Sequence, residues 1–211
     1  MSYNFIQTDK GGKPKNYEQD IVILTRSKRN DNSSEFCRDL KGRIKGYDLD
    51  LIKDEWSMLR GSSYSGAKMS SVDCYFKAAN GVHYFIEFKN ASREALDRVD
   101  SEDGIPLCIS LRRKAVDSLG LAGMTILQEE TGKQIQNNSV YFVVYRASAA
   151  DTLAVLDINK SLTVLAGGKD SIKRSYPIMW SLDTLKTVGL YRDVHTWPDT
   201  EFVSWAKDNL K

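Results

Sequence analysis

Three residues of the chain have the types and spacing that phosphodiester chemistry needs: Asp73, Glu87 and Lys89. Two carboxylates can hold a hard divalent cation such as Mg²⁺. A lysine beside them can orient a water molecule and stabilise the negative charge that develops on a phosphate. This chemistry requires a fold that brings Asp73 next to Glu87, fourteen residues later in the sequence.

The segment 72–89 predicts a β-hairpin that would do so, with Ala79-Asn80-Gly81 at its tip. A two-residue turn at Asn80-Gly81 would pair Asp73 with Phe88 and mix apolar and charged residues on both faces. A three-residue loop, with Gly81 in the left-handed region, pairs Asp73 with Glu87 instead. A shift of one residue moves every side chain to the other face, so a clean apolar face favours the three-residue loop. In this register one face carries only Val72, Cys74, Phe76, Tyr84, Ile86 and Phe88.

Residues paired across two strands have Cβ atoms roughly 5 Å apart, so Asp73 and Glu87 would repel each other unless a cation lay between them. Lys89 shares their face because it follows Glu87 by two residues. We therefore expect Asp73, Glu87 and the backbone carbonyl of Phe88 to bind Mg²⁺, with Mn²⁺ as an alternative ion. A solvated sheet face with no catalytic role would show the same pattern of residues.

Val72-Asp73, followed by Glu87-Phe88-Lys89 behind an apolar run, resembles the PD-(D/E)XK nuclease superfamily. The resemblance covers about residues 40–120, in the order helix, hairpin, helix and buried strand. It implies that Asp73 and Glu87 are metal ligands and that Lys89 is the catalytic lysine. One departure is Val72, which stands where the family has a proline that is frequently replaced.

The resemblance also implies two supporting residues on the neighbouring helices. A carboxylate on the preceding helix matches Glu55 best and Glu35 second. A basic residue on the following helix matches Lys114, with Arg113 as the alternative. Both helices have plainer interpretations, because Glu55 fits a polar helix face and Lys114 could pair with Asp117 by helical spacing.

Apolar periodicity and turn residues predict the elements that would position these residues. We expect helices at about 34–45, 49–60 and 107–121, a helix from about Asp199, a buried central strand at 140–145, and further strands at 153–158 and 162–165. The run Ile21 to Leu24 fits either a strand or a helical turn. The predicted fold class is α/β: a three-layer α/β/α domain with a mixed central sheet and a restriction-endonuclease-like core. The core would span about 32–146 of a single domain, 1–211, with additions at about 150–211.

The composition is that of an ordinary globular protein: 211 residues, 41% hydrophobic and 27% charged. Three widely spaced cysteines and two histidines fit neither a zinc knuckle nor a disulfide framework, so metal chemistry would depend on carboxylates. No apolar run is long enough for a membrane span, and the first residues lack the layout of a signal peptide. The sequence therefore predicts a cytoplasmic protein with no membrane partner.

The expected partner is nucleic acid, with DNA favoured over RNA, and a homodimer is compatible with the sequence. The net charge of +2 argues against such a partner, and a positive surface would come from Lys10, Lys13, Lys15, Arg26, Lys28 and Arg29. Trp180, Trp197 and Trp205 could stack nucleobases, although the size of their rings favours core packing. His83 and His195 suggest no catalytic role, and His195 is expected in a surface turn.

The function that the sequence predicts is Mg²⁺-dependent hydrolysis of phosphodiester bonds by a nuclease. The alternative is a non-catalytic binding module for nucleic acid or a protein partner, with the same fold or another α/β fold.

Overall fold

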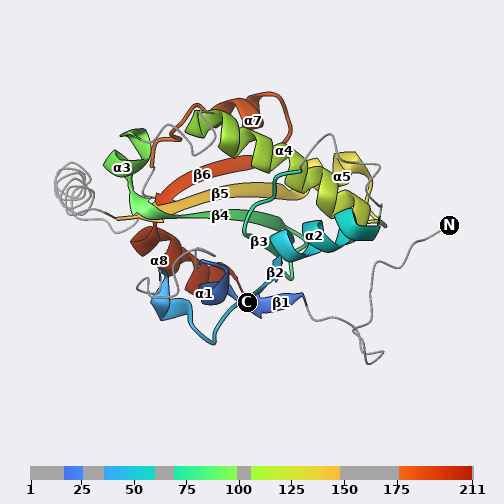
Figure 1. The fold of residues 1–211 in the computed structure, drawn as a ribbon, viewed down its shortest axis with the longest axis horizontal. Coiled ribbons are helices and arrows are strands. Elements are labelled where there is room, and N and C mark those ends of the chain that lie inside the picture. Colours follow the sequence, from blue (N-terminus) through green and yellow to red (C-terminus); the bar gives the residue numbers. More distant parts are fainter. Residues whose placement is uncertain (1–16, 26–35, 60–68, 99–105, 148–175, 211) are drawn as a thin grey trace, which may run out of the picture.

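The computed structural model describes residues 17–25, 36–59, 69–98, 106–147 and 176–210. These residues form a mixed α/β structure around a six-stranded sheet (Figure 1). The strands are β1 (Glu18–Asp20), β2 (Lys45–Asp48), β3 (Cys74–Lys77), β4 (His83–Ser92), β5 (Ser139–Arg146) and β6 (Asp193–Pro198). Their order in the sheet, β1-β2-β3-β4-β5-β6, is their order in the chain.

The sheet is antiparallel from β1 to β4 and parallel from β4 to β6. β5 is buried along nearly its whole length, as expected of a strand covered on both faces. This confirms the buried central strand that the run Val140 to Tyr145 predicted.

Helices pack on both sides of the sheet. The described residues form α1 (Ile21–Leu24), α2 (Leu49–Leu59), α3 (Arg93–Arg98), α4 (Leu107–Thr125), α5 (Gly132–Asn138), α7 (Asp183–Thr187) and α8 (Asp199–Asn209), together with a 3₁₀ turn, η1 (Arg38–Leu40). In Figure 1, α4, α5 and α7 lie above the sheet, and α1 and α8 lie below it.

Two hydrophobic clusters fill the spaces between these helices and the sheet. The first, called here the α4 cluster, includes Leu111 and Ala115 of α4, Leu49 and Ile52 of α2, and Tyr141 of β5. The second, called here the α8 cluster, includes Ile21 of α1, Leu40 of η1, Phe202 and Ala206 of α8, and Phe142 of β5. Because neighbouring residues on β5 enter different clusters, both faces of the sheet are covered.

The hairpin β3–β4 has the predicted register. Cys74 pairs with Ile86 and Lys77 with His83, so Ala79-Asn80-Gly81 is a three-residue loop. Gly81 has a φ of 80°, the left-handed conformation that the loop requires and that glycine adopts without strain. The Asn80 side chain accepts a hydrogen bond from the Val82 backbone N–H at 3.1 Å, which closes the turn.

The predicted apolar face of the hairpin differs at one residue. Cys74, Phe76, Tyr84, Ile86 and Phe88 contact the α8 cluster. Val72 lies in the α4 cluster instead. The strand begins only at Cys74, so the alternation of faces does not extend back to Val72.

Three predicted helices are present. α2 begins after Asp48, whose carboxylate accepts the Leu51 N–H at 2.9 Å, and α8 begins after Pro198. α4 starts at the predicted residue and runs four residues further than 121. The run Ile21–Leu24, which fitted either a strand or a helical turn, is a helical turn.

Two other predictions are wrong within the described residues. The segment 36–48 contains η1 and β2 in place of the predicted helix, because Gly46 fits closely against Cys74 of β3 and main-chain pairing holds this segment in the sheet. His195 lies on β6, where its ring stacks against Phe142 and Trp197, and not in a surface turn. The predicted strands at 153–158 and 162–165 and the six basic residues of the N-terminal region lie outside the described residues, as does Glu35. In the described segments no helix has the length and hydrophobicity to cross a membrane.

Candidate metal and phosphate site

Glu87 is the centre of a group of charged side chains on the α4 side of the sheet. It lies on β4 and is only 1% exposed, which contradicts the interpretation of this face as a solvated one. Its Oε1 atom lies 2.7 Å from Lys89 Nζ and 2.7 Å from Lys114 Nζ. Its Oε2 atom is buried and has no hydrogen-bond partner. A buried carboxylate oxygen without a partner is costly, so this atom marks a position where a ligand would be stabilised.

Asp73 lies immediately before β3, and its side chain crosses to β4. Its Oδ2 atom accepts a hydrogen bond from the Phe88 backbone N–H at 2.7 Å. β3 begins only at Cys74, so the Phe88 N–H is satisfied by the Asp73 side chain in place of a backbone carbonyl of that strand. The register would place Asp73 opposite Glu87, and the charge of Glu87 does act on Asp73.

Lys114 reaches this group from α4. Its ammonium group donates to Glu87 and not to Asp117, which is paired with Arg113 at 3.6 Å. The structure therefore brings Asp73, Glu87, Lys89 and Lys114 together from three elements.

The two carboxylates differ in their protonation. Burial, and next the charge of Glu87, raise the pKa of Asp73 to about 7. Burial also acts to raise the pKa of Glu87, but the charges of Lys114 and Lys89 outweigh it and hold that pKa below its usual range. For Lys114, burial opposes the charged form, but Glu87 and Asp73 raise the pKa above its ordinary value. The site therefore pairs one carboxylate whose ionised form is favoured with one that can change its charge near neutral pH.

Side chains of α4 and α2 hold the segment that leads into Asp73. The backbone N–H groups of Ser70 and Val72 donate to Asp117 Oδ2 at 2.8 Å and to Ser118 Oγ at 2.9 Å. The Ser71 hydroxyl donates to Asp50 Oδ1 at 2.5 Å. Three consecutive residues before Asp73 are therefore fixed by side chains from two helices.

The expected role of Glu55 beside the metal stays a prediction. It is buried on α2 and accepts a hydrogen bond from the Tyr17 hydroxyl at 2.6 Å. The α2 carboxylate whose charge reaches Lys114 is Asp50, which lies at the first turn of the helix. Burial opposes the ionised form of Asp50, but the hydrogen bonds from Lys53 and Ser71 lower its pKa.

Sequence reasoning missed Asp50 as a site residue. The signal that could have found Asp50 is its position in the sequence, directly after the segment that forms β2. Asp50 lies at the start of α2, next to the end of β2, and β2 pairs with the beginning of β3. A carboxylate at this helix start is therefore closer to Asp73 than one a turn and a half further on.

The described residues contain no group of three or more His, Cys, Asp or Glu side chains arranged to hold a metal ion. Mg²⁺ is commonly bound by one or two carboxylates together with water and substrate phosphate, so two carboxylates are sufficient for that ion. The Phe88 side chain packs in the α8 cluster on the opposite face, while its backbone lies between Glu87 and Lys89. The role of its carbonyl stays a prediction.

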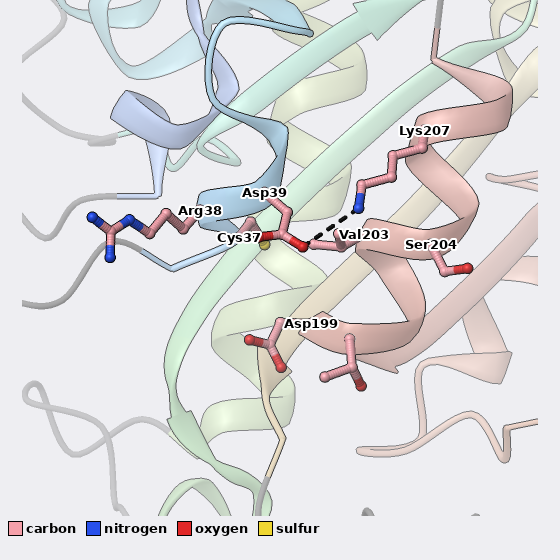
Figure 2. Close-up of a pocket in the computed structure, with 8 residues that line it drawn as sticks. Cys37, Arg38, Asp39, Asp199, Val203, Ser204 and Lys207 are labelled. Atoms are coloured by element: carbon pink, nitrogen blue, oxygen red, sulfur yellow. Dashed lines mark hydrogen bonds and ion pairs between the residues drawn. The ribbon is translucent and has the colours of Figure 1, made fainter.

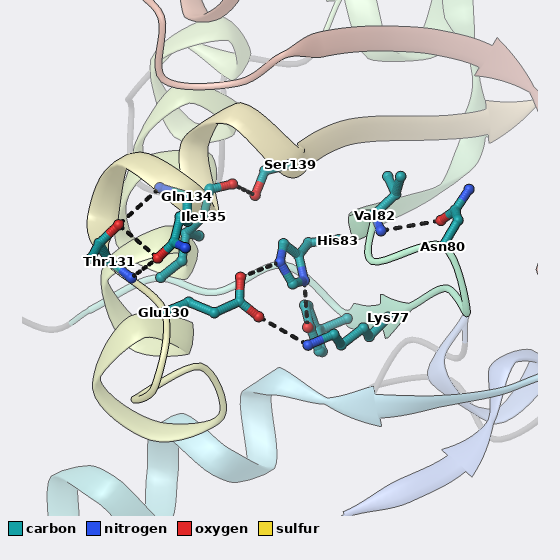
Figure 3. Close-up of polar contacts among 10 residues, drawn as sticks. Lys77, Asn80, Val82, His83, Glu130, Thr131, Gln134, Ile135 and Ser139 are labelled. Carbon is teal, nitrogen blue, oxygen red and sulfur yellow. Dashed lines mark hydrogen bonds and ion pairs between the residues drawn. The ribbon is translucent and has the colours of Figure 1, made fainter.

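A second polar network lies at the hairpin end of the sheet and includes His83, four residues before Glu87 on β4 (Figure 3). His83 is fully buried; its Nε2 atom lies 2.8 Å from Glu130 Oε2, and its Nδ1 atom lies 2.9 Å from the Tyr75 hydroxyl. Lys77 donates to the other oxygen of Glu130 at 2.9 Å. These contacts connect the hairpin to the loop between α4 and α5, which is a structural role for His83.

A pocket lies between η1 and the first turns of α8, on the α8 side of the sheet (Figure 2). Lys207 Nζ and Asp39 Oδ2 form an ion pair across it at 3.4 Å. Cys37 lines the pocket, and burial, followed by the charge of Asp199, raises the pKa of its thiol. A thiol held in its protonated form is a poor nucleophile, so this pocket offers no evident catalytic group.

Comparison with known proteins gave no match: no family model, no curated protein and no solved structure is similar to this chain.

Proposed function

We propose that this protein is a Mg²⁺-dependent nuclease with a three-layer α/β/α fold and a restriction-endonuclease-like core. The fold proposal is supported by the order of α2, β3, β4, α4 and β5, which is the order of the PD-(D/E)XK core. It is also supported by the two hydrophobic clusters on opposite faces of the sheet.

The observation that carries the functional proposal is the buried, unpartnered Oε2 atom of Glu87 beside Asp73. A protein that needed only an ion pair here would satisfy both oxygens of a buried carboxylate. One free oxygen next to a second carboxylate fits a divalent cation, which would also remove the repulsion between Asp73 and Glu87.

In this proposal Glu87 Oε2, Asp73 and the Phe88 carbonyl hold Mg²⁺. The bound ion would lower the pKa of the attacking water and neutralise charge on the phosphate. The Mn²⁺ ion would fit the same oxygen ligands.

The two lysines have different tasks in the mechanism. Both ammonium groups lie 2.7 Å from Glu87 Oε1, and the two side chains are about equally exposed, 23% for Lys114 and 24% for Lys89. Their tasks are assigned by position: Lys114, on α4, would keep Glu87 ionised and oriented, and Lys89, two residues after Glu87 on β4, would reach substrate. Lys89 would donate to a nonbridging oxygen of the scissile phosphate and stabilise the charge that builds up in the transition state.

The proposed substrate is nucleic acid, with DNA favoured over RNA. This preference follows from the resemblance to PD-(D/E)XK nucleases and not from a contact in the structure.

The test is cleavage of single-stranded and double-stranded DNA by the purified protein with Mg²⁺ or Mn²⁺, comparing wild type with Lys89→Ala. We expect the variant to fold and to lose at least 100-fold in rate, as is usual when a group that stabilises transition-state charge is removed. Lys133→Ala is the matched control, because Lys133 is exposed on α5. Full activity of Lys89→Ala would refute the mechanism.

Calorimetric titration of Mg²⁺ separates the two functional classes. Binding that depends on Asp73, with no cleavage of any nucleic acid, would favour a non-catalytic binding module. Absence of metal binding, even with DNA present, would refute the metal site.

A further inference from the structure

Trp180 lies beside the proposed nuclease site, and the proposed mechanism gives it no role. Lys89 on β4 pairs with Tyr145 on β5, so their side chains are neighbours on the same face. The Trp180 ring packs edge-on against Tyr145, with centroids 6.1 Å apart and planes at 86°. Tyr145 is buried, whereas Trp180 is only partly buried. The indole therefore borders the surface next to Lys89.

Contacts from two other elements fix the orientation of this indole. Its Nε1–H donates to Asp97 Oδ1 of α3 at 2.9 Å. The next residue, Ser181, accepts a hydrogen bond through its carbonyl from an Arg112 terminal nitrogen of α4 at 2.7 Å. α3 follows the end of β4 (Figure 1), so the ring is anchored at the end of the strand that carries Glu87 and Lys89.

The backbone at this point is strained. Trp180 and Ser181 have φ angles of 55° and 51°, in the left-handed region that residues other than glycine seldom adopt. Two consecutive residues in this conformation are held there by surrounding contacts, and such strain concentrates at functional sites. Packing alone would not require it, because a bulky side chain can fill space from an unstrained backbone.

We propose that Trp180 is a stacking platform for an unpaired nucleobase next to the phosphate that the site would cleave. The inference rests on the proposed nuclease function and assigns its substrate to single-stranded nucleic acid, or to a single-stranded end or flap. Bases within an intact duplex are stacked on each other, so they present no free face to the indole, whereas unpaired bases stack readily on aromatic rings.

The chemistry of the surroundings agrees with this ligand. An aromatic face accepts any base, and Arg112 of α4 brings a guanidinium to the residue next to Trp180, because it donates to the Ser181 carbonyl. The Nε atom of Arg112 is buried and has no hydrogen-bond partner, so the protein does not use the full donor capacity of this cation. Asp97 is engaged by the indole and by Arg93 at 3.7 Å, which reduces its repulsion of a phosphate.

The experiment measures binding in the absence of metal, so that no cleavage occurs. The probe is a fluorescein-labelled thymidine oligonucleotide of about ten nucleotides, within the range of single-strand site sizes. A second probe has the same backbone length without bases. Anisotropy titrations compare wild type, Trp180→Leu, which keeps an apolar side chain, and Trp180→Phe, which keeps an aromatic face.

We expect Trp180→Leu to bind the thymidine probe about 5- to 150-fold more weakly, the range that corresponds to the loss of one base–aromatic stack. Trp180→Phe should fall between this variant and wild type. Both variants should bind the probe without bases as wild type does, because stacking requires the base. The matched control is Trp205→Leu, which removes an indole from the α8 cluster and should leave binding unchanged.

Equal loss on both probes, or no loss on either, would overturn the platform. If Trp180→Leu does not fold, the test uses Trp180→Phe. The platform is overturned if Trp180→Phe binds both probes as wild type does and wild type binds the two probes with equal affinity. Failure of the proposed function looks different, because wild type would then cleave no nucleic acid with Mg²⁺ or Mn²⁺, whereas the platform is tested by binding alone.

Discussion

Asp73 and Glu87 are carboxylates in contact with the same strand, yet their surroundings give them opposite properties. Two lysine ammonium groups compensate for the burial of Glu87, whereas Asp73 receives one backbone N–H and the repulsion of Glu87. The metal-free protein therefore has an unfavourable negative charge at Asp73 above neutral pH. If the site binds a cation as proposed, this is the expected cost of preorganising it.

The first consequence concerns stability without metal. The pKa of Asp73 is about 7 in the folded state, well above the roughly 3.9 of an unfolded aspartate. The protonated carboxyl stabilises the fold below about pH 4, and this contribution is lost as the pH rises through 7. We expect the melting temperature of Asp73→Asn to exceed that of wild type by several degrees more at pH 8 than at pH 5, since about 1 kcal/mol shifts Tm by roughly 2–4 °C.

Thermal melting in a chelating buffer between pH 5 and 8 checks this prediction. Asp208→Asn on α8 is the control, because Asp208 is exposed. A variant that is less stable than wild type at pH 8 would contradict the electrostatic description of the site.

How far each site residue could be predicted depended on whether its position follows from nearby sequence. Asp73, Glu87 and Lys89 follow from hairpin register, because turn length and alternation of apolar residues are readable within eighteen residues. Lys114 came from the family resemblance and lies where that resemblance implied. The hydrogen bond from Tyr17 to Glu55 was not predictable, because it depends on how the residue before β1 packs against α2, a contact across 38 positions.

At the scale of elements, α4 is the scaffold of the site. It supplies Lys114 to Glu87 and, one turn later, Asp117 and Ser118 to the backbone before Asp73. Lys114 and Ser118 are four residues apart and so lie on one helix face. One helix therefore positions both carboxylates, one directly and one through the backbone.

Ser118→Ala tests this role of α4. The buried Val72 N–H would lose its acceptor, at a cost of about 1–3 kcal/mol, and the segment before Asp73 would be free to shift. We expect weaker Mg²⁺ binding by calorimetry, with Glu87 and Lys89 unchanged, and a smaller loss of cleavage than in Lys89→Ala. Ser57→Ala, at an exposed position of α2, serves as the control. Wild-type affinity for Mg²⁺ in a destabilised Ser118→Ala protein would limit Ser118 to a structural role.

Elements with strong local signals were predicted, and those held by distant contacts were not. The hairpin, α2, α4, β5 and α8 each carry their own turn, cap or periodic pattern. β2 is four residues long and contains Gly46, so its extended conformation depends on pairing with β1 and β3. β6 alternates buried and partly exposed residues, but Asp193 and Pro198 at its ends resemble a loop when seen without β5.

For the whole molecule, the two ends of β4 have separate tasks. The first residue, His83, belongs to the network with Glu130 and Tyr75, and the proposed site begins at Glu87. Stability and chemistry can therefore be altered independently along one strand.

Glu130→Ala tests this separation. It would leave the buried Nε2 atom of His83 without a partner, which costs about 1–3 kcal/mol, so we expect a Tm several degrees lower. Cleavage measured well below Tm should stay at the wild-type rate. Lys77→Ala is the control, because an exposed ion pair contributes about 1 kcal/mol or less. A cleavage defect in folded Glu130→Ala would show that the two ends of β4 are coupled.

The order of the strands has a consequence for how this chain folds. Every described strand pairs with the strand before it in the sequence, so the sheet can grow in one direction as the polypeptide leaves the ribosome. Within the antiparallel half, the β3–β4 hairpin can form first because only residues 78–82 separate its two strands, whereas residues 21–44 and 49–73 separate the earlier strand pairs. β5 must pair in parallel and so waits for the long crossover through α4. Lys114 travels with that crossover, and the ion pair with Glu87 can therefore form only when the second half of the sheet docks on the first.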